Sequence, residues 1–143
     1  DSKSEPRGAL WVAVSFNDRE VNIVNTHLGL TAREQMLQTQ ELMSDEWLGS
    51  VLREKEPVIF CGDFNFHPGT RSYRRILEKM RDAQLTLQKH KPKNTFYSRF
   101  PLFRIDHIFI NDQVETLAIE VPKSKTAKYA SDHLPLIATF KIH

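Results

Sequence analysis

Residues 58–65 read VIFCGDFN, and this stretch changes from apolar to polar at its midpoint. Its first four residues form a continuous apolar run, which is typical of a strand buried on both faces of a sheet. Gly62 ends the run, and Asp63 and Asn65 follow directly. The stretch therefore predicts a central strand whose end carries a carboxylate and an amide, a common position for functional residues.

Three other segments share this arrangement, in which acidic, amide or imidazole groups stand at the end of a β-like run. They are residues 25–27 (NTH), 104–107 (RIDH) and 131–133 (SDH). A group of Asp, Asn and His side chains suits hydrolysis of a phosphate ester. That reaction needs a base to activate water, donors to the phosphoryl oxygens and a metal ion to offset charge. The four segments together predict such a site.

Each segment alone also has a purely structural explanation, in which its polar groups satisfy the backbone or one another. These alternatives are a core histidine at His27, Asx turns at Asp63 and Asn65, an Asp106–Arg104 ion pair, and a turn cap at Asp132.

The remaining patterns predict the elements that surround these segments. They are a β-hairpin over 9–16 and 21–26, a helix from a capping box at Thr31–Glu34 to about residue 56, a helix from near Thr70 with Tyr73, Ile76, Leu77 and Met80 inward, strands over 103–110, 116–121 and 136–142, and a loop over 124–131. This order predicts an α/β (α+β) fold, a sheet with helices on one face. The other face also needs cover, which these elements do not supply.

Composition limits the class of protein. With 143 residues, 40% hydrophobic and 27% charged, the chain is long enough for one globular domain. No apolar stretch approaches the length needed to cross a bilayer. Cys61 is the single cysteine, so an internal disulfide is excluded. A lone thiol fits a reducing compartment, and we predict a cytoplasmic location. Residues 1–8 are polar and resemble a linker.

The ordered series NTHL (25–28), GDFN (62–65), RIDHIF (104–109) and SDHLP (131–135) resembles the signature of the endonuclease/exonuclease/phosphatase superfamily. The resemblance covers nearly the whole chain. It implies a four-layer α/β/β/α sandwich with largely antiparallel sheets. Residues 1–143 are expected to form half or most of it, as a single domain that lacks its N-terminal part. Half a sandwich exposes an apolar sheet face, so we expect self-association through that face, or pairing with the absent half.

The resemblance also implies a role for each matching residue. His27 would donate to the phosphate, and Asn65 would touch it and orient the surroundings of Asp63. Water attack would be promoted by Asp63 and by His133, with Asp106 fixing the tautomer of His133. The implied cofactor is Mg²⁺ (or Mn²⁺), which Asp132 would approach. The family places its principal metal ligand, a Glu, before the first segment present here, which implies weak Mg²⁺ binding and little hydrolysis by residues 1–143 alone.

The substrate class stays open between nucleic acid and a phospholipid or small phosphodiester. The net charge of +2 is too small to indicate nucleic acid by itself. Basic clusters at 71–75 and 89–93 could contact phosphates, and Phe96, Tyr97 and Phe100 could stack or wedge, although solvated surface and core packing are the commoner explanations. Two other functions remain alternatives, a catalytically inactive domain that serves as a binding module and, more weakly, a structural zinc protein, for which no close Cys/His set exists.

Overall fold

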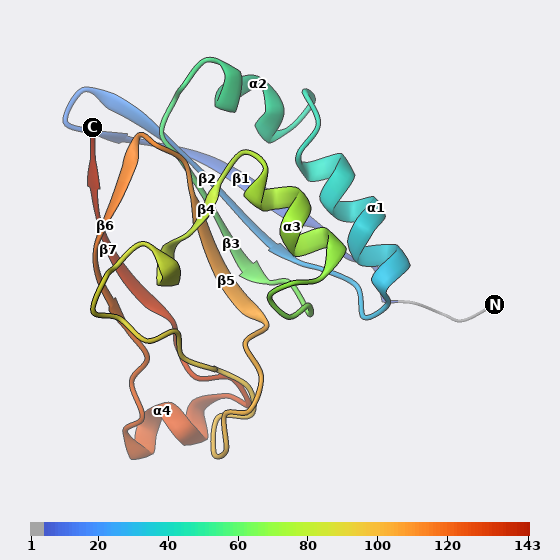
Figure 1. Ribbon diagram of the computed structural model, residues 1–143, viewed down its shortest axis with the longest axis vertical. Helices are drawn as coiled ribbons and strands as arrows, with labels where there is room; N and C mark the ends of the chain where they lie inside the picture. Colours follow the sequence, from blue (N-terminus) through green and yellow to red (C-terminus); the bar gives the residue numbers. More distant parts are fainter. Residues whose placement is uncertain (1–4) are drawn as a thin grey trace.

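The computed structural model describes residues 5–143, which form two sheets and four α-helices (Figure 1). The elements in chain order are β1 (Ala9–Phe16), β2 (Arg19–His27), α1 (Ala32–Leu42), α2 (Leu48–Arg53), β3 (Val58–Asp63), α3 (Arg71–Leu77), β4 (Arg81–Asp82), the 3₁₀ helix η1 (Ala83–Leu85), β5 (Asp106–Ile110), β6 (Val114–Glu120), α4 (Lys125–Ala130) and β7 (Ile137–Ile142). The larger sheet has the order β1-β2-β3-β5-β4, and β6 pairs with β7 in a second sheet. The predicted mixed α/β class is confirmed.

The N-terminal hairpin sets the edge of the larger sheet. β1 and β2 pair antiparallel from Ala9↔Thr26 to Phe16↔Arg19. Asn17 and Asp18 between them have φ values of 49° and 61°, the left-handed region that these two residue types tolerate best after glycine. β2 then runs parallel to β3, with helices α1 and α2 in the connection.

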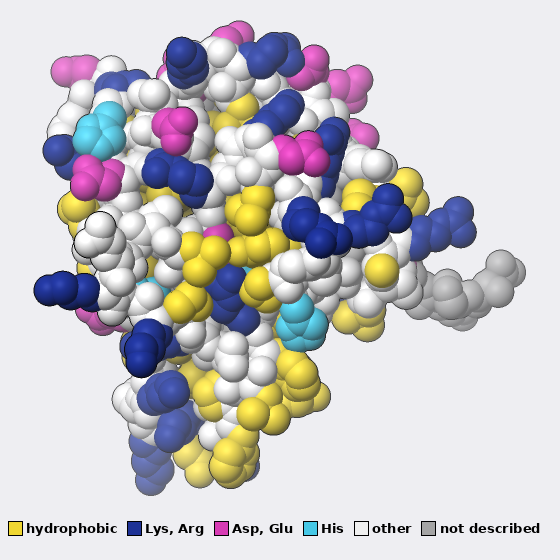
Figure 2. All heavy atoms as spheres, in the orientation of Figure 1, with side chains coloured by type: hydrophobic (Ala, Val, Ile, Leu, Met, Phe, Trp, Pro, Cys, Tyr) yellow, Lys and Arg dark blue, Asp and Glu magenta, His cyan; other side chains and the backbone are white. Residues whose placement is uncertain are grey.

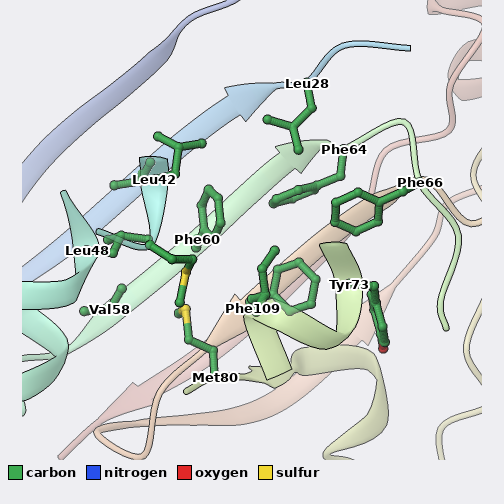
Figure 3. Close-up of a cluster of buried hydrophobic side chains, with 13 residues drawn as sticks. Leu28, Leu42, Leu48, Val58, Phe60, Phe64, Phe66, Tyr73, Met80 and Phe109 are labelled. Carbon is green, nitrogen blue, oxygen red and sulfur yellow. The ribbon is translucent and has the colours of Figure 1, made fainter. Parts of the chain in front are cut away.

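The main core lies between the larger sheet and helices α1–α3. Its centre is a group of aromatic rings from β3, β5 and the loop after β3, which meet edge to face (Figure 3). Phe60, Phe64 and Phe109 are fully buried there. Burying a side chain of this size stabilises the fold by roughly 1.5–3 kcal/mol, so this layer fixes β3 and β5 beside each other.

The opposite face of the sheet is covered unevenly. Ile59 of β3, Ile108 of β5 and Phe140 of β7 pack against one buried cluster that includes Ile119 of β6, so the β6–β7 sheet forms a second β layer there. On β1, by contrast, the large side chains that point to this face are exposed: Leu10, Val12, Val14 and Phe16. The prediction that these elements supply no cover for this face is therefore wrong over β3 and β5, which the β6–β7 sheet covers, whereas the expected exposed apolar face is present on β1.

Four sequence-based expectations about these elements were wrong. Residues 124–131 contain helix α4 where a loop was expected, because the Ser124 side chain caps its N-terminus by accepting from Ala127 N. The expected helix over 31–56 is two helices, interrupted by turns over residues 43–47. The strand expected from 103 begins at Asp106, and Leu77 of α3 is exposed.

From the sequence, we expected residues 1–8 to resemble a linker. Residues 5–8 have no regular secondary structure, and residues 1–4 lie outside the described residues. Across residues 5–143, no helix combines the length and apolarity that crossing a membrane would need.

Candidate functional site

Three neighbouring strands align one polar residue each at the same end of the larger sheet. His27 of β2 is the register partner of Asp63 in parallel β3, and Asp63 is the partner of Asp106 in antiparallel β5. Register partners point to the same face of a sheet. The strand pairing alone therefore brings an imidazole and two carboxylates together in one row.

The loop after β3 is held by backbone geometry that its sequence permits. Gly62 has φ +146°, and a Cβ at this position would lie 1.9 Å from the carbonyl oxygen of Thr26, so only glycine fits between β2 and β3. Asn65 has φ 53°, and its backbone N–H donates to Asp63 Oδ1 at 2.9 Å. Its side-chain Nδ2 donates to the carbonyl of Leu28 at 2.9 Å. Asn65 thus ties the ends of β2 and β3 together and orients Asp63.

His133 enters this row from the loop between α4 and β7. Its Nδ1 lies 2.8 Å from Asp106 Oδ2, and the same oxygen accepts the hydroxyl proton of Thr95. A carboxylate is acceptor-only, so Nδ1 carries a proton. Nε2 is then the basic nitrogen, and it faces Asp63 Oδ2 at 3.6 Å. This pairing is the arrangement of a base held by an orienting carboxylate.

The surroundings shift two pKa values in this row. Burial raises the pKa of Asp63, and the Asp106 carboxylate adds to that rise against the opposing effects of Asn65, His133 and His27. Burial alone would lower the pKa of His133, but the hydrogen bond and charge of Asp106, with the charge of Asp63, raise it above 6.5. The pKa of Asp63 is thus raised above that of a free aspartate, chiefly through burial, and the pKa of His133 is raised above that of a free histidine through its neighbours in the row.

His27 lies at the open side of the row. Its Nε2 is 3.4 Å from Asp63 Oδ2, and its side chain is 54% exposed, so it is not a core histidine. The guanidinium Nη1 of Arg7 is 3.0 Å from Nδ1 and 3.1 Å from Nε2 of the same ring. An imidazole and a guanidinium are therefore side by side where phosphoryl oxygens could bind.

The structure brings five of the six sequence-predicted residues together: His27, Asp63, Asn65, Asp106 and His133. Asp132 does not join them through its carboxylate. It is exposed, its Oδ1 accepts from the Ser131 hydroxyl, and its backbone carbonyl accepts from Ser98 N at 2.7 Å. The alternative pairing of Asp106 with Arg104 is absent, because Arg104 pairs with Asp82 on the opposite face.

Sequence reasoning missed three residues that support the row. Thr95 donates to Asp106, Arg7 contacts His27, and buried Gln35 of α1 donates to the carbonyls of Gly29 and Asn65. No pattern in the sequence identifies Thr95 or Arg7 as a supporting residue. For Gln35 the sequence shows only a glutamine within a predicted helix, which is a weak signal. Cys61 carries a thiol whose pKa is raised by burial, as expected of an inert cysteine.

The row could also hold a metal ion. Asp63, Asp106 and His133 each offer one ligand atom, and these atoms lie within 4.8 Å of one another. Carboxylate oxygens suit Mg²⁺, which takes one or two of them from a protein and keeps several waters. The donor set thus fits a divalent cation, although His133 Nδ1 and Asp106 Oδ2 are already engaged with each other.

Known proteins resemble this chain in sequence and in fold. Residues 4–133 match the Endonuclease/Exonuclease/phosphatase family. The uncharacterized protein YbhP of Escherichia coli is 31% identical over 137 residues, which are 94% of this chain and 53% of YbhP. The chain spans about half the length of the curated relatives it matches.

Two solved structures show the same fold at low sequence identity. A functionally unknown protein from Enterococcus faecalis superposes with a TM-score of 0.80 at 22% identity, over 94% of this chain and 56% of that one. A mannosyl-6-phosphatase from Bacteroides thetaiotaomicron gives 0.74 at 18% identity, over 98% and 67%. Because the family match covers most of the sequence, this chain belongs to the Endonuclease/Exonuclease/phosphatase family, which contains both phosphatases and nucleases.

Proposed function

We propose that the protein hydrolyses phosphate esters with Mg²⁺ or Mn²⁺, and that His133 and Asp63 promote the attack of water. The observation that carries this proposal is the Asp106–His133 hydrogen bond, which leaves Nε2 of His133 as a base aimed toward Asp63. Membership of a family of phosphatases and nucleases supports the reaction class. The choice of Mg²⁺ or Mn²⁺ as the metal ion, and of the ester as the substrate, is part of our proposal and is not given by the family.

Each residue of the row has a chemical task in this proposal. His133 accepts a proton at Nε2, and Asp106 holds its tautomer and stabilises the resulting imidazolium. Asp63, whose pKa is raised, exchanges a proton with water or the leaving group. His27 and Arg7 donate to phosphoryl oxygens, and Asn65 keeps Asp63 in place. Asp63 and Asp106 would hold the metal, which when bound offsets charge on the phosphoryl group.

The test is metal-dependent release of p-nitrophenol from bis(p-nitrophenyl) phosphate by the full-length protein. Asp63→Ala and His133→Ala should each remove at least about 99% of the rate, since a positioned acid or base contributes roughly 10²–10⁴-fold. His143→Ala is the matched control, because His143 pairs with exposed Glu115, and no hydrogen bond or ion pair among the described residues joins it to the row. Full activity in both site variants would refute the assignment. Tight binding of the ester without any turnover would favour the alternative, a binding module.

Self-association is a separate part of the proposal, and it rests on the exposed side chains of β1. Leu10, Val12, Val14 and Phe16 form an apolar stripe along an edge strand. Sedimentation of residues 1–143 should show an oligomer that Val12→Lys converts to monomer, whereas a monomer at high concentration would contradict it. The cytoplasmic location, the metal role of Asp132, and the single domain lacking an N-terminal part stay predictions.

A further inference from the structure

A small tip projects from the site end of the molecule. It consists of residues 97–102 and residues 123–131, which include α4, and it lies apart from helices α1–α3 (Figure 1). Two hydrogen bonds hold its halves together. Ser98 Oγ donates to the carbonyl of Lys128 at 3.0 Å, and Ser98 N donates to the carbonyl of Asp132 at 2.7 Å.

The tip exposes large hydrophobic side chains. Phe100 is 77% exposed and Leu102 is 70% exposed, and Tyr97 and Tyr129 are more than half exposed. They come from both halves of the tip, so they form one surface, which we call the apolar tip. Figure 2 shows hydrophobic side chains gathered at this lower end of the molecule. An exposed apolar group of this kind usually marks an interaction site.

Basic residues outnumber acidic ones at the apolar tip, which exposed Asp132 borders. Residues 97–102 and 123–131 contain Arg99, Lys123, Lys125 and Lys128 and no Asp or Glu. Lys and Arg side chains also lie at this end in Figure 2, on the face that it shows. The partner of this surface should therefore be apolar within and anionic at its boundary.

The apolar tip adjoins the catalytic row. A groove of about 550 Å³ lies within it, lined by Tyr97, Phe100, Tyr129 and Asp132 among others. Asp132 precedes His133, and the ring of Phe96, next to Tyr97, lies 4.7 Å from the His133 ring. Whatever the tip binds is thereby held next to the base of the proposed reaction.

We propose that the apolar tip docks the protein on an anionic phospholipid surface, with Phe100 and Leu102 entering the headgroup region and the basic residues meeting lipid phosphates. A phosphoester at that surface would then lie against the row of His27, Asp63, Asp106 and His133. The placement of a phosphoester against the row rests on the proposed function, whereas the docking on the lipid surface does not.

Stacking of nucleic-acid bases explains these side chains less well. Stacking requires free aromatic faces. One face of Tyr129 is covered by the Arg99 guanidinium at 4.7 Å, and Tyr97 packs on Phe96 with ring centroids 3.7 Å apart. Leu102, one of the two most exposed tip residues, has no π-face to offer. An apolar, positively charged tip suits insertion into a lipid surface.

The test is co-sedimentation of the full-length protein with vesicles. Vesicles that contain phosphatidylglycerol should bind the protein, and pure phosphatidylcholine vesicles should bind it at least about 10-fold more weakly. The double variant Phe100→Ser/Leu102→Ser should lose at least about 10-fold in apparent affinity, because it removes two inserted apolar groups. Lys125→Glu/Lys128→Glu should lose a similar factor through charge, and added salt should weaken the wild type.

Leu37→Ser is the matched control, since Leu37 of α1 is 57% exposed and lies outside the tip. It should bind vesicles like the wild type. The proposal is overturned if phosphatidylglycerol vesicles fail to bind, if both tip variants bind normally, or if a single-stranded oligonucleotide binds through Phe100 and Leu102 and vesicles do not. The vesicle assay measures binding and needs no turnover. If the protein bound vesicles but hydrolysed no ester, the proposed function would be refuted and the docking inference would still hold.

Discussion

Strand β5 separates two clusters that each contain a carboxylate and an imidazole. Asp106 and His107 are adjacent, so their side chains point to opposite faces of the sheet. On one face Asp63, Asp106 and His133 form what we call the open cluster, with side chains 19–24% exposed. On the other face Asp82, Arg104 and His107 form the sealed cluster, and two of its side chains have no exposed surface.

The sealed cluster is built around one carboxylate. Asp82 Oδ2 lies 2.9 Å from Arg104 Nη2 and accepts the Tyr73 hydroxyl at 2.8 Å. Burial, followed by the nearby Asp82 charge, raises the pKa of Tyr73 to about 12, which keeps this hydroxyl a donor. His107 Nε2 lies 2.9 Å from the carbonyl oxygen of Phe66 and donates to it. The cluster therefore links α3, β4, β5 and the loop after β3.

The comparison teaches that solvent access separates a cluster that could act on a substrate from a structural one, although both contain a carboxylate and an imidazole. A buried ion pair contributes little net stability but is costly to break. The sealed cluster is placed to hold the loop that follows Asp63 and contains Asn65 and Phe66, and its side chains are at most 7% exposed. The open cluster, with two carboxylates and an imidazole, lies at a surface where a phosphate ester could arrive.

The largest expected effect comes from removing the charge that orients the open cluster. Asp106→Asn should lower kcat by about 10³-fold, because His133 loses the acceptor that fixes its tautomer. The free energy of unfolding should fall by only about 1 kcal/mol, the value of a typical hydrogen bond. Steady-state kinetics and urea unfolding on the same preparation measure the two effects.

Asp112→Asn provides the control for this variant. Asp112 pairs with Arg81 at the surface and is almost fully exposed. A surface pair of this kind has little effect on stability or rate. If Asp106→Asn kept its rate and instead lost several kcal/mol of stability, the open cluster would be a structural cluster like the sealed one.

Breaking the sealed cluster should give the opposite pattern. Arg104→Met leaves the buried Asp82 carboxylate without its cation, and such a change typically costs about 3–5 kcal/mol of unfolding free energy. Chemical denaturation measures this loss, with Arg75→Met as control, because Arg75 makes only an exposed ion pair with Glu78. The rate per folded molecule should stay within about threefold of wild type. A rate loss as large as that of Asp106→Asn would show that the two clusters are not separate in function.

The link between the clusters is tested by His107→Phe. The ring of His107 lies among Phe66, Tyr73 and Phe109, so phenylalanine suits the space but cannot donate to the Phe66 carbonyl. Loss of this buried hydrogen bond should cost about 1–3 kcal/mol. If the loop also shifts Asp63, kcat should fall severalfold while KM stays unchanged. His107→Gln, which keeps a donor, should recover part of both losses.

Two residues of the open cluster, with neighbouring His27, could be placed together from sequence because they stand at strand ends, whereas His133 lies in the loop between α4 and β7. His27, Asp63 and Asp106 stand at strand ends, and pairing in register brings such residues together without further information. The apolar run before Gly62 predicted the buried strand that positions Asp63. The capping box at Thr31 predicted the start of α1 correctly.

The sealed cluster could not be predicted, because no local pattern marks its partners. Asp82 ends the short edge strand β4, Arg104 precedes β5, and only the tertiary fold places their side chains 2.9 Å apart. Thr95 and Arg7 were missed for the same reason, since their partners Asp106 and His27 are distant in sequence. Helix α4 has no buried residue, so it lacked the apolar periodicity that reveals a helix.

The smallest expected effect is a difference in acid sensitivity. Burial opposes ionisation of Asp82, but the His107 ring, whose Nδ1 is 3.6 Å from Asp82 Oδ2, and the charge of Arg104 outweigh burial and hold the pKa of Asp82 below 3.8. A carboxylate with a lowered pKa in the folded state contributes stability that is present above the unfolded value and is lost as pH falls through the folded value. Asp82→Asn should therefore lose more stability at pH 7 than at pH 3, measured by urea midpoints, whereas exposed Asp112→Asn should show no such difference. An equal loss at both pH values would mean that the sealed cluster acts through hydrogen bonding and shape alone. The charge of Asp82 would then play no part in the comparison, and solvent access would remain as the difference between the two faces.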